Sequence, residues 1–533
     1  MNIKKISLSI VLLLSSVSIN NLRAEDSCDC VTGQTFFTVR PNFQSSMAEK
    51  ITSFRGRDKK REDGRLGAVQ IALFGSKSTN SKKIARYFSP ACKDILQVRE
   101  DSNATDIDIT SQHFGIFSAN AVAATTPFFS STIQFKPQQS TFGIGFNYRQ
   151  NLDGLSTKME DKELNLWFEI SAPLMHVKND MNLTEVIEDD GGGAATIAGL
   201  PEDQIIMPNM EEAFKQVRWK YGKIDGAQKK WGLADIELKL GRTWMQEEKC
   251  HIESYIGLLL PTGNKPKAEY VFEPMIGHNK HFGFIHGGAA SFHIWKSKYN
   301  EGKLYINNAW NCLYLFSKKE LRSFDMKNKP WSRYMEVYED LEQATAANAL
   351  TVPAEEALAT PGINLFTKDF DVDPGLMCNN TVALTYVKNR LQCEIGYNFY
   401  ARQKECVKLS NSWVTGPAFK AADGNGKTNN FRTIGNDFDN VVTLDAAGVA
   451  EQASSKLDKL LARYNENLIQ EEDIDLNSVA HPCVFAHTIH GSMDYNWDER
   501  NYPAILGAGA SYQFGQDCIL NRWTLWAKGG LSF

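Results

Sequence analysis

The segment from His481 to Ser492 is where histidine and serine lie close enough in sequence to suggest acid–base or nucleophilic chemistry. His487 and His490 are three residues apart, so on a β-strand they would face opposite sides and could not act as a pair. The chain contains no Gly-x-Ser-x-Gly, His-Glu-x-x-His or Walker motif. A lipid hydrolase is therefore a minor alternative, and the sequence predicts no cofactor and no metal site.

Charged and amide side chains of both signs alternate with apolar ones along several segments. Between Leu391 and Arg402, for example, Ile395 lies on an apolar face, whereas Glu394 and Asn398 lie on the polar one. If such a sheet closes into a barrel, the polar face lines a lumen whose charge and width decide which solutes pass. The candidate pore-lining residues are Asn147, Arg149, Glu163, Glu169, Asp235, Glu237, Lys239, Glu253, Lys303, Gln392, Glu394, Asn398, Arg402, Arg522 and Lys528.

The alternation extends over about ten residues per segment, which is the length that a tilted strand needs to cross a bilayer. Strands of a soluble sandwich are shorter, about five or six residues. The pattern predicts an all-β protein with a single transmembrane antiparallel β-barrel of about 14 strands, within a range of roughly 12–16. The predicted strands are 66–75, 109–117, 131–137, 140–150, 163–177, 232–247, 249–261, 280–297, 302–316, 380–389, 391–405, 482–491, 502–515 and 518–533.

The first residues of the chain have the pattern of an export signal. Lys4 and Lys5 precede an apolar stretch from Ile6 to Ile19, and Ala24 closes a plausible cleavage site. We therefore expect residues 1–24 to be a signal peptide.

The last predicted strand ends on Phe533, with Leu525 and Leu531 on the same apolar face. This ending is typical of bacterial outer-membrane β-barrels, a superfamily that the chain resembles in pattern over roughly 66–533. The resemblance implies a location in the bacterial outer membrane and contact with outer-membrane lipids and lipopolysaccharide. It also implies that the outer-membrane assembly machinery recognises Leu525, Leu531 and Phe533.

A second, weaker resemblance is to the hydrocarbon and fatty-acid uptake barrels of the FadL type. It is carried by residues 257–264, GLLLPTGN, which are similar to a strand-end motif in related sequences. That family has an N-terminal plug, and the resemblance implies transport of small apolar molecules.

The connections between the predicted strands agree with an outer-membrane topology. If the last strand runs inward, the tight connections near 248, 298–301 and 390 fall in the periplasm, with the moderate ones at 151–162 and 492–501. The long connections then all fall outside, and helical spacing within them predicts a structured cap. The predicted external loops are 76–108, 178–231, 262–279, 317–379 and 406–481, and the segments with helical spacing are 209–220, 333–349 and 445–470.

Composition narrows the class of protein. A hydrophobic content of 42% excludes global disorder, and a formal net charge of −5 argues against a nucleic-acid partner. The ten cysteines of an exported chain permit disulfides, although Cys250, Cys312 and Cys393 fall within strand patterns where a buried or lipid-facing thiol is expected.

The expected function is passage of small solutes or apolar molecules across the outer membrane, as in a porin, without covalent chemistry. The alternative is a structural or adhesive surface barrel that acts through its loops. Residues 25–65 are expected to form a periplasmic N-terminal segment or a plug. Within them, 35–40 can form a strand, and the basic run 55–61 could enter a lumen in which carboxylates predominate.

Overall fold

The computed structural model places most of the chain with enough certainty to describe it. The described residues are 33–41, 67–100, 106, 108–116, 128–152, 165–192, 207–247, 249–298, 301–327, 329–338, 360–414, 417–419, 469–497, 502–516 and 518–533.

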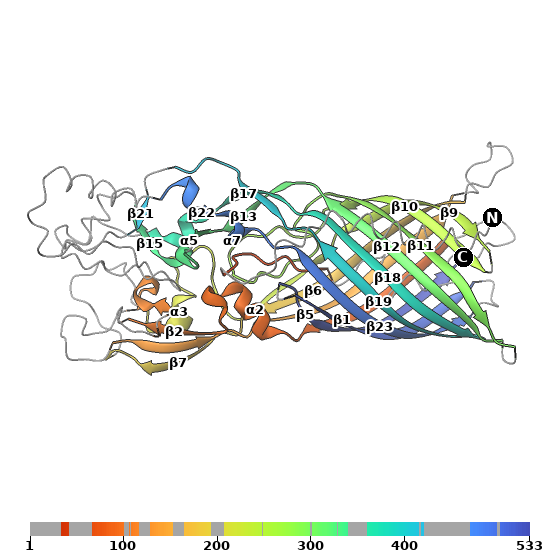
Figure 1. The fold of residues 1–533 in the computed structure, drawn as a ribbon, viewed down its shortest axis with the longest axis horizontal. Helices are drawn as coiled ribbons and strands as arrows, with labels where there is room; N and C mark the ends of the chain where they lie inside the picture. The colour runs from red at the N-terminus through yellow and green to blue at the C-terminus, as the bar shows by residue number, and fades with distance from the viewer. Residues whose placement is uncertain are drawn as a thin grey trace, which may run out of the picture.

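The wall of the molecule is a closed antiparallel barrel of 12 strands (Figure 1). Each strand pairs with the next wall strand along the chain, and β25 pairs with β1 to close the ring. One further strand, β8 (Gln228–Leu233), pairs with β6 outside the closed ring. The wall strands are β1 (Gly67–Ser78), β5 (Gln138–Asn151), β6 (Leu166–Asp180), β9 (Ile236–Gln246), β10 (Cys250–Leu260), β11 (Gly283–Lys296), β12 (Lys303–Leu315), β18 (Gly375–Lys388), β19 (Leu391–Arg402), β23 (Val484–Trp497), β24 (Ala504–Gly515) and β25 (Arg522–Ser532).

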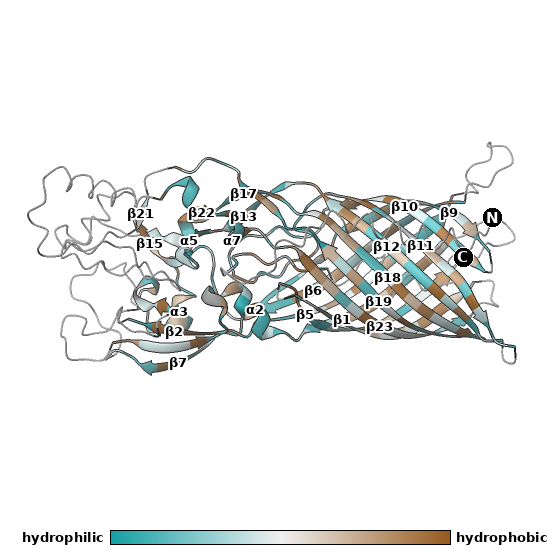
Figure 2. Cartoon of the chain, in the orientation of Figure 1, coloured by the Kyte–Doolittle hydropathy of each residue, from teal (hydrophilic) through white to brown (hydrophobic). Residues whose placement is uncertain are grey.

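Alternation of apolar and polar residues explains why these segments form a barrel wall. Figure 2 shows hydrophobic and hydrophilic residues alternating along the strands. In β5, Phe142, Ile144 and Phe146 are exposed on the outer face, whereas Asn147 and Arg149 are buried. An apolar outer face around a polar interior is the arrangement that a bilayer requires of a barrel.

Two of the predicted wall strands are wrong. Residues 109–117 form only a two-residue strand, β3 (Ile109–Thr110), and a 3-10 turn at Ser111–Phe114. Residues 131–137 correspond to β4 (Ser130–Gln134), whose five residues are too few to cross a bilayer. Both strands belong to a separate four-stranded sheet, so the barrel has 12 strands rather than about 14, and its first long loop continues to residue 137.

The connections sort by length to the two ends of the barrel, as the sequence predicts. The long connections carry all the elements outside the wall to one end, which we call the loop end (Figure 1). Phe533 and the short connections, such as 247–249 and 389–390, lie at the other, the turn end.

The long connections pack into an ordered cap. One of its cores is built around Phe324, Met335, Phe366 and Phe370, all buried. The cap elements besides β3, β4 and β8 are α2 (Ser81–Phe88), η3 (Pro90–Cys92), β2 (Ile95–Arg99), η4 (Ser111–Phe114), β7 (Thr184–Asp189), α3 (Met210–Ala213), β13 (Lys318–Ser323), β14 (Asp325–Met326), η6 (Ser332–Tyr334), β15 (Glu336–Tyr338), β16 (Thr360–Pro361), α5 (Gly362–Leu365), β17 (Thr367–Asp373), β20 (Cys406–Leu409), β21 (Ala418–Phe419), η8 (Glu471–Asp473), β22 (Ile474–Asp475) and α7 (Leu476–Val479).

The helices predicted in the loops are mostly wrong. The segment 209–220 is helical only over α3, and Val217 points to solvent instead of joining Met210 and Phe214 in the core. The segment 333–349 forms a 3-10 turn and strand β15 as far as it is described. Nearly all of 445–470 lies outside the described residues. Within the described part of the chain, no helix has the length and hydropathy needed to cross a membrane.

Candidate functional site in the barrel lumen

Strand β19 shows how the wall positions its polar side chains. Ile395 and Tyr397 are exposed on the outer surface, with 63% and 43% of their area accessible. Gln392, Glu394 and Asn398 alternate with them and are almost fully buried. The two faces of this strand are therefore as the sequence predicts.

The interior holds most of the residues predicted to line a pore. Thirteen of the fifteen are buried: Asn147, Arg149, Glu169, Asp235, Glu237, Lys239, Glu253, Gln392, Glu394, Asn398, Arg402, Arg522 and Lys528. Lys303 is partly exposed at the turn end, and Glu163 lies outside the described residues. Water reaches little of the surface of the buried thirteen, so they lie in a packed interior.

Buried ion pairs connect wall strands across the interior of the barrel, including strands that are not neighbours in the wall. Arg149 on β5 lies 2.6 Å from Glu253 on β10, and its guanidinium stacks 3.7 Å from the centre of the Trp167 ring. Lys239 on β9 lies 2.8 Å from Glu237 and 3.5 Å from Glu169. Such charges are stable inside a protein only when they are paired, and these pairs satisfy that condition.

A second charged group joins β19, β23 and β25. Lys528 lies 3.1 Å from Asp494, and His490 lies 3.6 Å from Glu394. Thr385 donates a hydrogen bond of 2.8 Å to the same glutamate. Lys528 and Glu394 are among the predicted pore-lining residues, whereas Asp494 and His490 are not. Asp494 falls in the connection predicted at 492–501, but β23 continues to Trp497. His490 falls in a predicted strand, and its sequence does not indicate which carboxylate it will meet.

Arg40, from the N-terminal segment, reaches into this polar interior. Its guanidinium donates hydrogen bonds of 2.7 Å to the side-chain oxygens of both Asn379 and Asn398. It also donates to Gln513 at 2.9 Å and Thr488 at 3.3 Å. One side chain thus contacts four wall strands, β18, β19, β23 and β24.

The backbone around Arg40 is held as well. Arg522 at the start of β25 donates hydrogen bonds to the carbonyl oxygens of Arg40 at 3.0 Å and Pro41 at 3.2 Å. The ring of Tyr400 lies 4.5 Å below the Arg40 guanidinium, a cation–π contact. The sequence around Arg40 gives no sign of this role, because its partners lie 339 to 482 positions further along the chain.

The preceding residues of the segment join the interior to the cap. Phe37 packs against Tyr87 and Phe88 of α2 and against Phe272. Thr38 donates a hydrogen bond of 2.8 Å to Glu405. The described segment 33–41 therefore lies at the loop end of the barrel, between the wall and the cap. The segment contains no β-strand, so the strand predicted at 35–40 is wrong.

Arg322 is the centre of a buried charge network beneath the cap. Its guanidinium lies 2.6 Å from Glu405 and 2.7 Å from Glu320, and Glu320 also bonds His281 at 2.6 Å. The same guanidinium stacks 3.7 Å from the ring centre of Phe36. This network fixes the loops against residues 33–41.

The environment shifts the pKa of two groups in this network. Burial alone would raise the pKa of Glu405, but the charges of Arg322 and Arg402 outweigh it and hold the pKa well below its usual range. Burial and the charge of Arg402 lower the pKa of His481 well below 6.5. At neutral pH, therefore, Glu405 is ionised and His481 is neutral.

The prediction that the basic run 55–61 enters a carboxylate-rich lumen is not tested by the described residues. The run 55–61 lies outside the described residues. The basic residue that does reach the interior is Arg40, and its partners named above are neutral amide and hydroxyl groups rather than carboxylates. The hydrogen bonds to these neutral acceptors and the contact with the Tyr400 ring both help to position Arg40.

The histidines lie on different faces of the wall, as the sequence predicts. His487 points outward, where Tyr397 lies 2.6 Å from its Nδ1 and Phe514 stacks on its ring. His490 points inward and is buried. Among the described residues, no group of three or more histidine, cysteine, aspartate and glutamate side chains could hold a metal ion.

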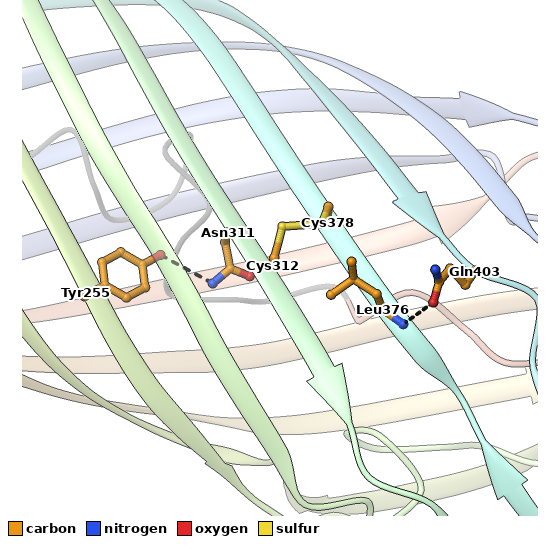
Figure 3. Close-up of a disulfide and its surroundings, with 6 residues drawn as sticks. All are labelled: Tyr255, Asn311, Cys312, Leu376, Cys378 and Gln403. Atoms are coloured by element: carbon orange, nitrogen blue, oxygen red, sulfur yellow. Dashed lines mark hydrogen bonds between the residues drawn. A yellow bond between two sulfur atoms is a disulfide. The ribbon is translucent and has the colours of Figure 1, made fainter. Parts of the chain in front are cut away.

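One disulfide joins two wall strands. Cys312 on β12 and Cys378 on β18 are opposite each other in the register and bonded (Figure 3). The expectation of a free thiol at Cys312 is therefore wrong, because its partner lies beside it only once the strands pair. Cys250 and Cys393 are free and half-buried.

Comparisons with known proteins found structures but no sequence relatives. No protein-family model and no curated protein matches the chain. The transport unit of the autotransporter AIDA-I from Escherichia coli is 7% identical, with a TM-score of 0.33 and coverage of 92% of this chain and 96% of that one. A FadL homologue from Pseudomonas aeruginosa is 7% identical, with a TM-score of 0.25 and coverage of 94% and 98%. The toluene transporter TodX from Pseudomonas putida is 9% identical, with a TM-score of 0.24 and coverage of 94% and 96%.

Proposed function

We propose that this closed antiparallel barrel is an outer-membrane channel that its own N-terminal segment closes at rest. Passage of solute would require residues 33–41 to move away from the wall. In this proposal the signal peptide 1–24 directs export, residues 25–65 include the plug, and 66–533 form the barrel in the bacterial outer membrane. The barrel would contact outer-membrane lipids and lipopolysaccharide, and the assembly machinery would insert it.

The observation that carries the proposal is the position of Arg40. A side chain that bonds four wall strands from the inside, beneath an ordered cap, occupies the path that a solute would take. The four acceptors named above are neutral amide and hydroxyl groups, and hydrogen bonds to neutral acceptors are weaker than bonds to carboxylates. These four bonds are therefore individually weaker than the paired charges of the wall.

The chemistry of the interior favours small polar solutes over apolar ones. The predicted pore-lining residues that are buried have charged or amide side chains, with charges of both signs, and a polar solute can exchange its hydration for such groups. A hydrocarbon would gain nothing from them, so uptake of apolar molecules is the less favoured form of the proposal.

Solute efflux from liposomes tests the proposal. Arg40→Ala removes the four side-chain hydrogen bonds and should raise the efflux rate of a small sugar above that of the unaltered protein. Arg86→Ala removes an exposed arginine of α2 in the cap and should leave the rate unchanged. If the unaltered protein, Arg40→Ala and Arg86→Ala all fold as barrels but none lets the sugar pass, the proposal of a channel is refuted.

The ordered cap favours a second candidate, a surface barrel that acts through its loops. The cap has its own core around Phe324 and Phe370, which mobile loops would not need. Under this alternative the barrel would serve as a membrane anchor, and whole cells displaying it would bind a surface or partner while its liposomes stayed impermeable.

A further inference from the structure

Arg402, at the loop end of β19, is a buried charge whose guanidinium is only partly satisfied. It is 1% exposed, and its Nε and Nη2 atoms have no hydrogen-bond partner among the described residues, although its charge acts on the carboxylate of Glu405 nearby. Burying an unpaired charge costs several kcal/mol, so proteins pair such groups or supply a ligand. These two nitrogens therefore call for an anionic or polar acceptor that the described residues do not provide.

A small cavity lies at this guanidinium. Arg402 and Tyr400 line it from the wall, His278 from a loop, and Thr38 and Pro41 from the N-terminal segment. The cavity has room for about one water-sized particle. The Nε2 atom of His278, which lines the same cavity, also has no partner among the described residues.

The surrounding charges favour an anion in this cavity. Arg40 and Arg522 lie near the same tyrosine as Arg402, so three guanidinium groups gather around Tyr400. Glu405 also lines the cavity, but its carboxylate is occupied by Arg322, Thr38 and the His481 backbone N–H. Asp235 bonds the Nδ1 atom of His278 and Glu320 bonds His281, so these carboxylates are engaged elsewhere.

From this geometry we infer that the cavity at Arg402 binds a small monovalent anion of chloride size. The bound anion would neutralise Arg402 and reduce the repulsion among the three arginines. A second consequence rests on the proposed function. The same site would make the opened channel select anions over cations, because an arginine cluster at a constriction attracts anions and repels cations.

Bromide, which scatters anomalously, tests the site directly in crystals of the full-length protein. We expect an anomalous peak within hydrogen-bond distance of the Arg402 guanidinium, whereas water alone in the cavity would overturn the inference.

In solution, sodium chloride should raise the Tm above that in sodium gluconate at equal ionic strength, because the ligand binds only the folded state. Arg402→Met should abolish this difference, and Arg242→Met, an exposed arginine of β9, should preserve it. An equal difference in all three proteins would also overturn the site.

Selectivity is measured separately, from reversal potentials of the Arg40→Ala channel in a potassium chloride gradient. Chloride should permeate better than potassium, and adding Arg402→Met should lower the permeability ratio about tenfold, equivalent to about 1.4 kcal/mol. A conducting channel without anion preference would refute the selectivity. A protein that binds bromide but never conducts would refute the channel while establishing the anion site.

Discussion

The Nη2 atom of Arg40 lies 2.7 Å from the Oδ1 atom of Asn398, although the two residues are 358 positions apart in the sequence. Asn398 in turn donates a hydrogen bond of 2.8 Å to Thr381 on the neighbouring strand. The N-terminal segment is thereby coupled to the wall at a point where the outer face of the same strand contacts lipid in our proposal. Changes on the two faces of β19 should consequently have different effects.

Replacing Ile395 by lysine tests the assignment of the outer face. Ile395 has 63% of its surface exposed on the outside of the barrel, and a lysine near the middle of the bilayer should cost about 2–4 kcal/mol of folding free energy. Urea-dependent unfolding in lipid vesicles measures the loss, and Ile395→Leu serves as the apolar control. Equal stability of the lysine and leucine variants would show that this face does not meet lipid.

Replacing Arg322 by methionine should destabilise the cap. The change leaves Glu320 and Glu405 as buried carboxylates without their cation, and breaking a buried pair in this way costs roughly 3–5 kcal/mol. We expect the loops to be cleaved faster by added protease while the barrel remains folded. Arg86→Met, which breaks an exposed pair with Asp94, should change the stability by less than about 1 kcal/mol. Similar cleavage rates for the two variants would show that the network does not hold the cap.

Acid should loosen the cap in two steps. Because the pKa of His481 is lowered by burial, the unfolded chain takes up a proton there first, and stability falls as the pH drops below about 6.5. The pKa of Glu405 is lowered by Arg322, so its contribution is complete above about 4.5 and is lost as the pH falls through its folded value. The Tm of the cap should therefore stay constant from pH 8 to about pH 7 and decrease from about pH 6.5 down to pH 4.

His481→Phe separates the two steps. Phenylalanine keeps the packing against Phe37 and Tyr87 but cannot bind a proton, so the decrease should begin only below about pH 5. His176→Phe, on the outer face of β6, should retain the full pH dependence. A His481→Phe protein with the original profile would exclude this histidine as the first titrating group.

The barrel wall could be predicted from sequence because the signal is local. Alternation over ten or more residues, as in β19, is set by the two environments of each strand and needs no knowledge of distant contacts. Short strands such as β4 carry the same alternation over fewer residues, and only the separate sheet that they form shows that they lie outside the wall. The prediction of helices in the loops is wrong for a related reason. The apolar spacing at Met210 and Phe214 reflects burial against other loops rather than a long helix.

The candidate site could be predicted only in part. The inward position of Glu394 or Lys239 follows from strand periodicity, but the partner of each depends on which strands become neighbours and in which register. Arg40 could not be identified at all, since nothing near it in sequence indicates that Asn379, Asn398 and Gln513 will converge on it. The inward position of Arg402 follows from strand periodicity, but only the folded structure shows that its Nε and Nη2 atoms have no hydrogen-bond partner among the described residues.

Single-channel conductance in a planar bilayer tests the central claim most directly. The unaltered protein should be closed for most of the recording, and a variant lacking residues 33–41 should show long openings of larger conductance, because the contacts of Arg40 and its backbone with the wall are gone. Heat-modifiable migration in gels would confirm that both barrels are folded. A folded deletion variant with the conductance of the unaltered protein would contradict the account.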